Sequence, residues 1–99
     1  MGTYLLTATV REDAIGVRYV TMRAEWEFPV GLKVKVMIAR HQDIDSNVMD
    51  MFTAFVVKRG RGTAFNVPKK EVTDLTAGAW VDMMIEVDDK ERRRLLDNS

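Results

Sequence analysis

The chain contains no cysteine, a single histidine and two serines among its 99 residues. The lack of cysteine excludes disulfides, thiolate metal sites and cysteine nucleophiles, and it makes an intracellular, cytoplasmic setting the default expectation. His41 and Ser46 fall in one polar segment, so a serine triad would require close neighbours in sequence to converge. We therefore nominate no catalytic residue and expect neither enzymatic activity nor a cofactor.

Long hydrophobic runs and an excess of one charge are also missing. No stretch approaches the roughly 18 consecutive apolar residues of a membrane span, and residues 1–6 lack the basic start of a signal peptide. Fifteen basic and fifteen acidic residues cancel, which argues against a protein that coats nucleic acid through its overall charge. We expect one soluble domain over residues 1–99 with no membrane partner, in which any nucleic-acid contact depends on local charge.

An internal repeat organises what is present. Residues 6–10 (LTATV) match residues 52–56 (FTAFV), 46 positions later. The same interval, and an interval of 47 after one inserted residue, relates Gly16 to Gly62, Tyr19 to Phe65, Gly31 to Gly78, Val34 to Val81 and Met37 to Met84. Such self-similarity is typical of a duplicated supersecondary unit. We predict a first repeat over about 4–40, a linker over 41–50, a second repeat over about 51–88 and a tail over 89–99.

Each repeat reads as strand, turn, strand, short helix and strand. The predicted strands are 4–11, 17–22, 34–38, 51–58, 63–67 and 81–87, because apolar residues alternate with polar ones and Gly16, Gly60 and Gly62 fit the hairpin turns. Pro68 and Gly78 bracket a predicted helix over 68–75, whereas Pro29 limits the equivalent segment 23–28 to about one turn. For the tail we predict one or two helical turns capped by Asp89, with Arg92, Arg93 and Arg94 exposed.

Neither repeat has enough apolar surface to fold alone, so the two repeats are expected to interlock. The predicted fold is mainly β: a small closed barrel of two tandem ββαβ repeats with pseudo-two-fold symmetry. Swapped-hairpin and double-psi threading use the same elements and both stay open. Aromatic residues at strand and helix positions are expected mostly in the core, and the seven methionines are expected to fill gaps there. The aromatic residues concerned are Trp26, Phe28, Phe52, Phe65 and Trp80.

Residues 57–72 (VKRGRGTAFNVPKKEV) resemble the motif of the SpoVT/AbrB family, especially its MazE-type antitoxins. Lys58, Gly60 and residues 67–69 (VPK) fit that spacing, whereas Gly78 is followed by alanine in place of the aspartate of the motif. The resemblance covers residues 51–87, and the first repeat is a degenerate copy with Met22 in place of the proline. In that family two chains exchange hairpins to form one barrel, so this chain resembles such a dimer fused into one polypeptide. Double-psi, RIFT and YdeI/OmdA-type barrels are related alternatives, and the last of these brings no chemistry.

The resemblance implies a DNA-binding transcriptional regulator. Its DNA-contacting residues would be Lys58, Arg59 and Arg61 of the second hairpin, with Lys69 and Lys70 of the following helix. Arginine and lysine neutralise phosphates and release counterions, and glycine allows a close approach of the backbone. The simpler alternative is a solvated basic turn. The first hairpin carries mixed charges over residues 11–13 (RED), which leaves a fused pseudo-dimer with one competent face.

The alternative function is a non-enzymatic protein-interaction or assembly module, present as a monomeric pseudo-dimer or a weak homo-oligomer. Metal sites are not expected: residues 43–47 begin like a calcium loop, but Val48 stands where the required glycine belongs. His41 has no second histidine or cysteine to complete a transition-metal set. Residues 60–62 (GRG) lack the remaining residues of a dinucleotide-binding or Walker motif, so they are read as a turn.

Overall fold

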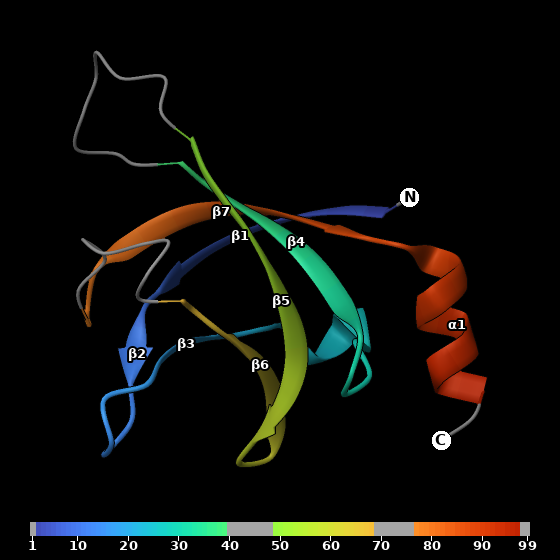
Figure 1. Ribbon diagram of the computed structural model, residues 1–99, viewed down its shortest axis with the longest axis horizontal. Helices are drawn as coiled ribbons and strands as arrows, with labels where there is room; N and C mark the ends of the chain where they lie inside the picture. Colours follow the sequence, from blue (N-terminus) through green and yellow to red (C-terminus); the bar gives the residue numbers. More distant parts are fainter. Residues whose placement is uncertain (1, 40–48, 69–76, 98–99) are drawn as a thin grey trace.

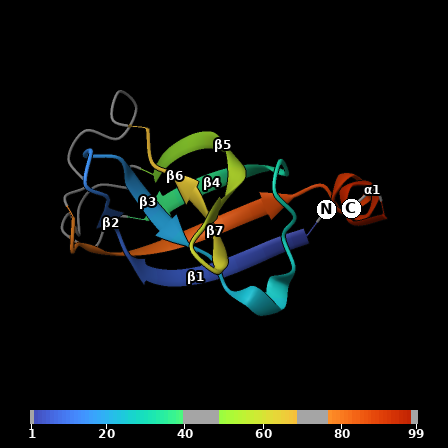
Figure 2. The same cartoon turned by 90° about the horizontal axis from the view of Figure 1, so that it is seen from below.

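Seven antiparallel strands and two short helices make up the computed structural model, which describes residues 2–39, 49–68 and 77–97 (Figure 1). The elements in chain order are β1 (Gly2–Thr9), β2 (Arg11–Glu12), β3 (Arg18–Thr21), the 3-10 helix η1 (Ala24–Trp26), β4 (Lys33–Ala39), β5 (Met49–Arg59), β6 (Gly62–Asn66), β7 (Trp80–Val87) and the helix α1 (Asp89–Asp97). The order across the sheet is β1-β7-β4-β5-β6-β3-β2. The mainly β prediction is confirmed, and the sheet curls into a half-barrel (Figure 2).

Alternating side chains explain why these segments form strands. Val34, Val36 and Ile38 of β4 are each 0% exposed, while the intervening Lys33 and Lys35 are exposed. The same alternation runs along β7, whose odd-numbered residues from 81 to 87 are all buried. A period of two places one set of side chains on the inner face of the curled sheet. The strands predicted over 34–38 and 81–87 are confirmed.

The core lies inside the curl and draws on both halves of the chain. Phe65, Leu32 and Ile85 are fully buried, and the Phe52 and Phe65 rings lie 6.1 Å apart between centroids. Fully burying an aliphatic or phenyl side chain contributes roughly 1.5–3 kcal/mol, so this apolar cluster is the main source of stability. Of the aromatic residues predicted for the core, Phe28, Phe52 and Phe65 are buried. Trp26 is only half-buried and Trp80 is 68% exposed, so the core prediction is wrong for Trp80.

Two strands pass from one half of the sheet to the other. β5 pairs with β4 up to Phe55 and with β6 from Val56 onward. β1 pairs with β7 up to Thr9, and after Val10 the chain continues as β2, which pairs with β3. Val10 and Val56 therefore stand at the two crossings, and both are buried at 1% exposure.

Matching hydrogen bonds hold the two crossings. The N–H of Gly31 donates to the carbonyl of Val56, and the N–H of Gly78 donates to the carbonyl of Val10, both at 2.8 Å. In return, Val56 donates to Leu32 at 2.8 Å and Val10 donates to Ala79 at 3.0 Å. Gly31 and Gly78 have φ values of 94° and 90°, in the left-handed region that favours glycine. Glycine at these two points lets the chain turn sharply into β4 and β7.

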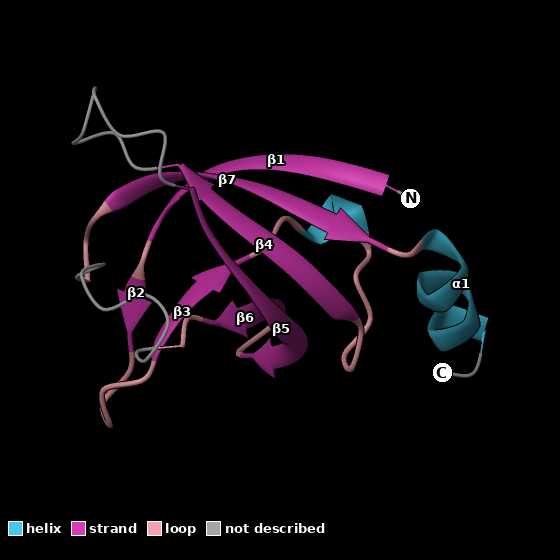
Figure 3. Cartoon of the chain, turned by 45° about the horizontal axis from the view of Figure 1, so that its top comes forward, coloured by secondary structure: helices cyan, strands magenta, loops and turns pink. Residues whose placement is uncertain are grey.

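The C-terminal helix α1 packs against one end of the half-barrel, near the N-terminus (Figure 3). Asp88 Oδ1 accepts the N–H of Lys90 at 3.0 Å, so Asp88 and not the predicted Asp89 caps the helix. The reason is that β7 ends at Val87, which leaves Asp88 as the first residue free to turn. Arg92 was predicted to be exposed, but it is half-buried and its Nη2 donates to the carbonyl of Trp26 at 3.0 Å.

The remaining predictions fall partly outside the described residues. The segment predicted as a helix over 68–75 lies outside them from residue 69 onward, as does most of the linker predicted over 41–50. β5 already begins at Met49, two residues inside that predicted linker. The single turn predicted over 23–28 is present as the three-residue helix η1. Glu27, which follows the helix, lies in the left-handed region.

Candidate nucleic-acid interface

The second hairpin places three cations at its tip. β5 and β6 are joined by the two-residue turn Gly60–Arg61, and Arg59 pairs with Gly62 across it. Gly60 adopts a φ of 57°, which a tight hairpin turn requires and which glycine accepts without strain. Lys58 and Arg61 are exposed, whereas Arg59 is only partly so. The local sequence therefore presents two cations to solvent and turns the third toward the sheet.

Arg59 is held by three neighbours outside β5: Tyr19 of β3, Asn66 of β6 and Asp13 of the loop between β2 and β3. Its Cζ lies 3.9 Å from the centroid of the Tyr19 ring, a cation–π contact. Its Nη2 donates to Asp13 Oδ2 at 3.1 Å and to Asn66 Oδ1 at 3.4 Å. The Arg59 and Asp13 side chains are 26% and 23% exposed. The guanidinium is therefore fixed in position, because a stacked and hydrogen-bonded arginine has little rotamer freedom left.

The first hairpin positions the carboxylate that meets Arg59. Asp13 Oδ1 accepts the N–H of Val17 at 2.9 Å and the N–H of Ile15 at 3.0 Å, which closes the loop between β2 and β3. The hydrogen bond from Val17 lowers the pKa of Asp13 most. Burial opposes it as the next largest effect, and the hydrogen bonds from Arg59 and Ile15 lower the pKa further, so that the net shift is downward. Asp13 is thus ionised at neutral pH and neutralises part of the charge of Arg59.

An open depression of about 750 Å³ lies beside the hairpin tip. Its lining residues are Arg11, Tyr19, Thr21, Val57, Lys58, Arg59, Gly60 and Asn66. The charged residues among them are all cations and come from β2 and β5, at opposite ends of one half of the sheet. We use the name basic hairpin surface for the set Arg11, Tyr19, Lys58, Arg59, Arg61 and Asn66.

The outcome for the predicted DNA-contacting residues is mixed. The structure brings Lys58, Arg59 and Arg61 to one hairpin tip, as expected from their spacing. Arg59 forms an ion pair with Asp13, so its guanidinium is not free to move toward a phosphate. Lys69 and Lys70 lie outside the described residues. Their part in any interface stays a prediction.

Sequence reasoning missed four members of this neighbourhood. The sequence pattern treats Arg11 and Asp13 only as part of a mixed-charge hairpin that weakens the site, and it gives Tyr19 and Asn66 no part in the site. One signal was available: Asp13 precedes Arg59 by 46 positions, the interval of the internal repeat. The pairing of β3 with β6, which places Tyr19 opposite Asn66, had no local sequence signal.

The described residues contain neither a metal-binding group nor a membrane-spanning helix. Within residues 2–39, 49–68 and 77–97, no group of three or more histidine, aspartate and glutamate side chains is arranged to hold a metal ion. Neither helix in these ranges is long and apolar enough to cross a membrane. Comparison with known proteins finds no matching family model, no similar curated protein and no similar solved structure.

Proposed function

We propose that the protein binds duplex DNA as a regulator of the AbrB-like type, and that it does so through the basic hairpin surface. One observation carries the proposal: Arg11, Lys58 and Arg59 line one depression, and no carboxylate is among the described residues that line it. Such a cluster provides a local positive field although the whole chain is neutral. Phosphate oxygens are the natural ligands of clustered arginine and lysine.

The residues of the basic hairpin surface would have different roles in DNA binding. Lys58, Arg61 and Arg11 are exposed and can each neutralise a phosphate. Arg59 is already stacked on Tyr19 and bound to Asp13, so its role is to hold the hairpin at a fixed angle. Asn66 Oδ1 accepts from Arg59 Nη2, which leaves the amide NH₂ of Asn66 to donate to an acceptor on a base edge.

We also infer that the chain is a fused pseudo-dimer, two interlocked copies of one unit that together close a barrel. The registers support this: β1 pairs with β7 as β5 pairs with β4, and Met37 lies opposite its own repeat counterpart Met84. The equivalent hydrogen bonds at Val10 and Val56 add support, since those residues are also 46 positions apart. This is the arrangement that the AbrB-like resemblance implies.

Titration of a labelled random-sequence duplex at several salt concentrations tests the proposal. Three exposed cations predict a log–log salt slope of about −2.7, at about 0.9 for each phosphate contact. Lys58→Ala combined with Arg61→Ala should reduce the slope to about −0.9 and weaken binding most at low salt. Both side chains are exposed, so the double variant should fold as the wild type does.

The matched control is Lys90→Ala combined with Arg93→Ala. Both residues are exposed, and the two substitutions also remove two positive charges, but the residues lie on α1. The control should bind DNA as the wild type does. Absence of binding by the wild type at low salt would overturn the proposal, and so would an equal loss of affinity in the two double variants.

A second candidate function, a protein-interaction or assembly module, is favoured by a different observation. Leu5, Met51 and Trp80 are apolar side chains that are more than half exposed on β1, β5 and β7. Exposed apolar side chains that gather on one face mark an interaction surface more often than a free one. The half of the sheet that carries them is distinct from the one that carries the basic hairpin surface.

A further inference from the structure

A row of four apolar side chains crosses the outward face of β1, β7, β4 and β5. Leu5 lies opposite Met84, Met84 opposite Met37, and Met37 opposite Met51. Directly opposed residues of antiparallel strands point to the same side of a sheet, and the next residues along these strands, such as Ile38, form the core. The row therefore faces outward, and we call it the methionine row.

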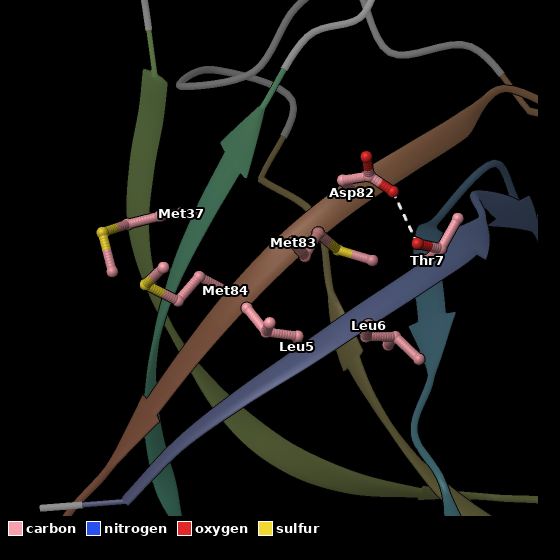
Figure 4. A pocket seen from close by; sticks show the side chains of 7 residues that line it. All are labelled: Leu5, Leu6, Thr7, Met37, Asp82, Met83 and Met84. Atoms are coloured by element: carbon pink, nitrogen blue, oxygen red, sulfur yellow. Dashed lines mark hydrogen bonds between the residues drawn. The ribbon is translucent and has the colours of Figure 1, made fainter.

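The methionine row is exposed enough to bind a partner. Leu5 is 71% exposed and Met51 54% exposed, and Met37 and Met84 are half-buried between them. Figure 4 shows the side chains of Leu5, Met84 and Met37 at a pocket of about 340 Å³. Methionine is flexible and polarisable, so it adapts well to an opposing surface. The prediction that methionines fill gaps in the core holds for Met22 and Met83 in the buried set, but not for this row.

The charges beside the methionine row are sorted by strand. The outward charged residues of β4 are Lys33 and Lys35, both exposed. Those of β7 are Asp82 and Glu86, and Asp82 accepts a hydrogen bond of 2.5 Å from Thr7 Oγ1 (Figure 4). Lys35 lies opposite Glu86 in the ladder. One strand is thus basic and its neighbour acidic, on either side of the boundary between them.

This pattern is self-complementary, and we infer that the face binds the same face of a second copy of this chain. The inference deepens the second candidate function and does not depend on DNA binding. A two-fold axis that lies in the interface and runs along the boundary between β4 and β7 places β4 of each copy over β7 of the other. Lys35 then faces Glu86 of the second copy, Met37 faces Met84, and Leu5 faces Met51. An isologous interface of this kind buries the apolar row and pairs opposite charges.

The charges also select this axis over the other simple arrangement. A two-fold axis perpendicular to the strands places β7 over β7 of the second copy and brings Glu86 over Asp82. Two carboxylates then face one another across the interface, and like charges opposed in this way cost free energy. Aligned packing of two sheets, with strand directions within about 30° of each other, is one of the two common ways in which sheets stack.

A charge-exchange experiment tests the interface. By sedimentation velocity, the wild type should reach twice the 11.3 kDa mass of one chain as its concentration rises. Lys35→Glu and Glu86→Lys should each weaken self-association by about tenfold, because like charges then meet across the axis. An equimolar mixture of the two single variants should associate as the wild type does, since the carboxylate introduced in one variant then faces the ammonium group introduced in the other. Effects of either substitution within its own chain cannot produce this recovery.

Lys90→Glu is the matched control, because it makes the same charge change as Lys35→Glu at an exposed position on α1. It should leave self-association unchanged, and circular dichroism should show every variant folded. A wild type that stays monomeric at all concentrations overturns the inference, and so does a mixture that stays as monomeric as its components. A monomer that binds DNA would overturn only the dimer inference and leave the DNA-binding proposal standing. A dimer that does not bind DNA would overturn only the DNA-binding proposal.

Discussion

The guanidinium of Arg59 donates a hydrogen bond of 3.1 Å to the carboxylate of Asp13, which lies 46 positions earlier in the chain. Forty-six is also the interval between Gly16 and Gly62, so under the proposed duplication Asp13 and Arg59 occupy equivalent places in the two hairpins. A symmetric dimer of identical chains would carry the same residue at both places and bring like charges together. The proposed fusion of two units into one chain would remove that constraint, so that an ion pair can replace the repulsion.

Replacing Asp13 with asparagine separates the two effects of its carboxylate. The amide oxygen can still accept the N–H groups of Ile15 and Val17, but the negative charge beside Arg59 is lost. We expect the melting temperature to fall and the affinity for duplex DNA at low salt to rise by about threefold, the scale of one partly exposed charge pair. Thermal unfolding and the DNA titration measure the two quantities.

Glu12→Gln is the control for this substitution. It removes the same negative charge at the neighbouring position, and Glu12 is exposed. It should leave the melting temperature at the wild-type value. An Asp13→Asn variant that melts like the wild type would show that the pair with Arg59 contributes nothing to stability.

Stability should decrease in acid through Asp13 and Glu91. The pKa of Asp13 lies below its ordinary value of 3.8, chiefly through the hydrogen bond from Val17, and that of Glu91 lies below 4.5, chiefly through the hydrogen bond from Arg94. A carboxyl whose pKa is lower in the folded state stabilises the fold above its unfolded pKa and loses this contribution as the pH falls through its folded pKa. The urea concentration at the unfolding midpoint of the wild type should therefore fall below about pH 4.

The Asp13→Asn variant isolates one of these two contributions. Its midpoint should fall less steeply with acid than that of the wild type, because the variant has no carboxyl at this position to protonate. Parallel curves for the two proteins would contradict the assignment of Asp13.

Arg92 should determine whether α1 stays docked. Its Nη2 donates to the carbonyl of Trp26, whose ring lies 5.1 Å from that of Tyr4 and 5.5 Å from that of Phe28. Leu95 of the same helix packs against the core. We expect Arg92→Ala to lower the free energy of unfolding by about 1.5–3 kcal/mol, the contribution of a hydrogen bond that involves a charged group, and to expose Trp26 to water.

Tryptophan fluorescence reports this directly once Trp80, the second tryptophan, is replaced by phenylalanine in every protein compared. Arg92→Ala should then shift the emission of Trp26 to longer wavelength. Arg93→Ala, at an exposed position of the same helix, should leave both emission and stability unchanged. An equal effect of the two substitutions would indicate that lost helix charge, not the contact with Trp26, is responsible.

Strands and turns were predictable because their causes are local. The alternation of Val34, Val36 and Ile38 with lysines requires only that one face of a strand be buried. The turn predicted between residues 58 and 63 is present and contains Gly60 as expected, because its positive φ depends on the residue itself, but Gly62 is already part of β6. The cap of α1 was misplaced by one residue, since the choice between Asp88 and Asp89 depends on where the pairing of β7 with β1 ends.

The sequence by itself determined the mainly β class, the strand positions and the concentration of positive charge at residues 58–61, because periodicity, turn chemistry and charge act between near neighbours. Only the tertiary structure decided which strands pair. That pairing holds Arg59 between Asp13 and Tyr19, and it aligns Leu5, Met84, Met37 and Met51 in one exposed row. These contacts join residues far apart in the chain, and their partners are selected by the packing of the whole core, which no local pattern records.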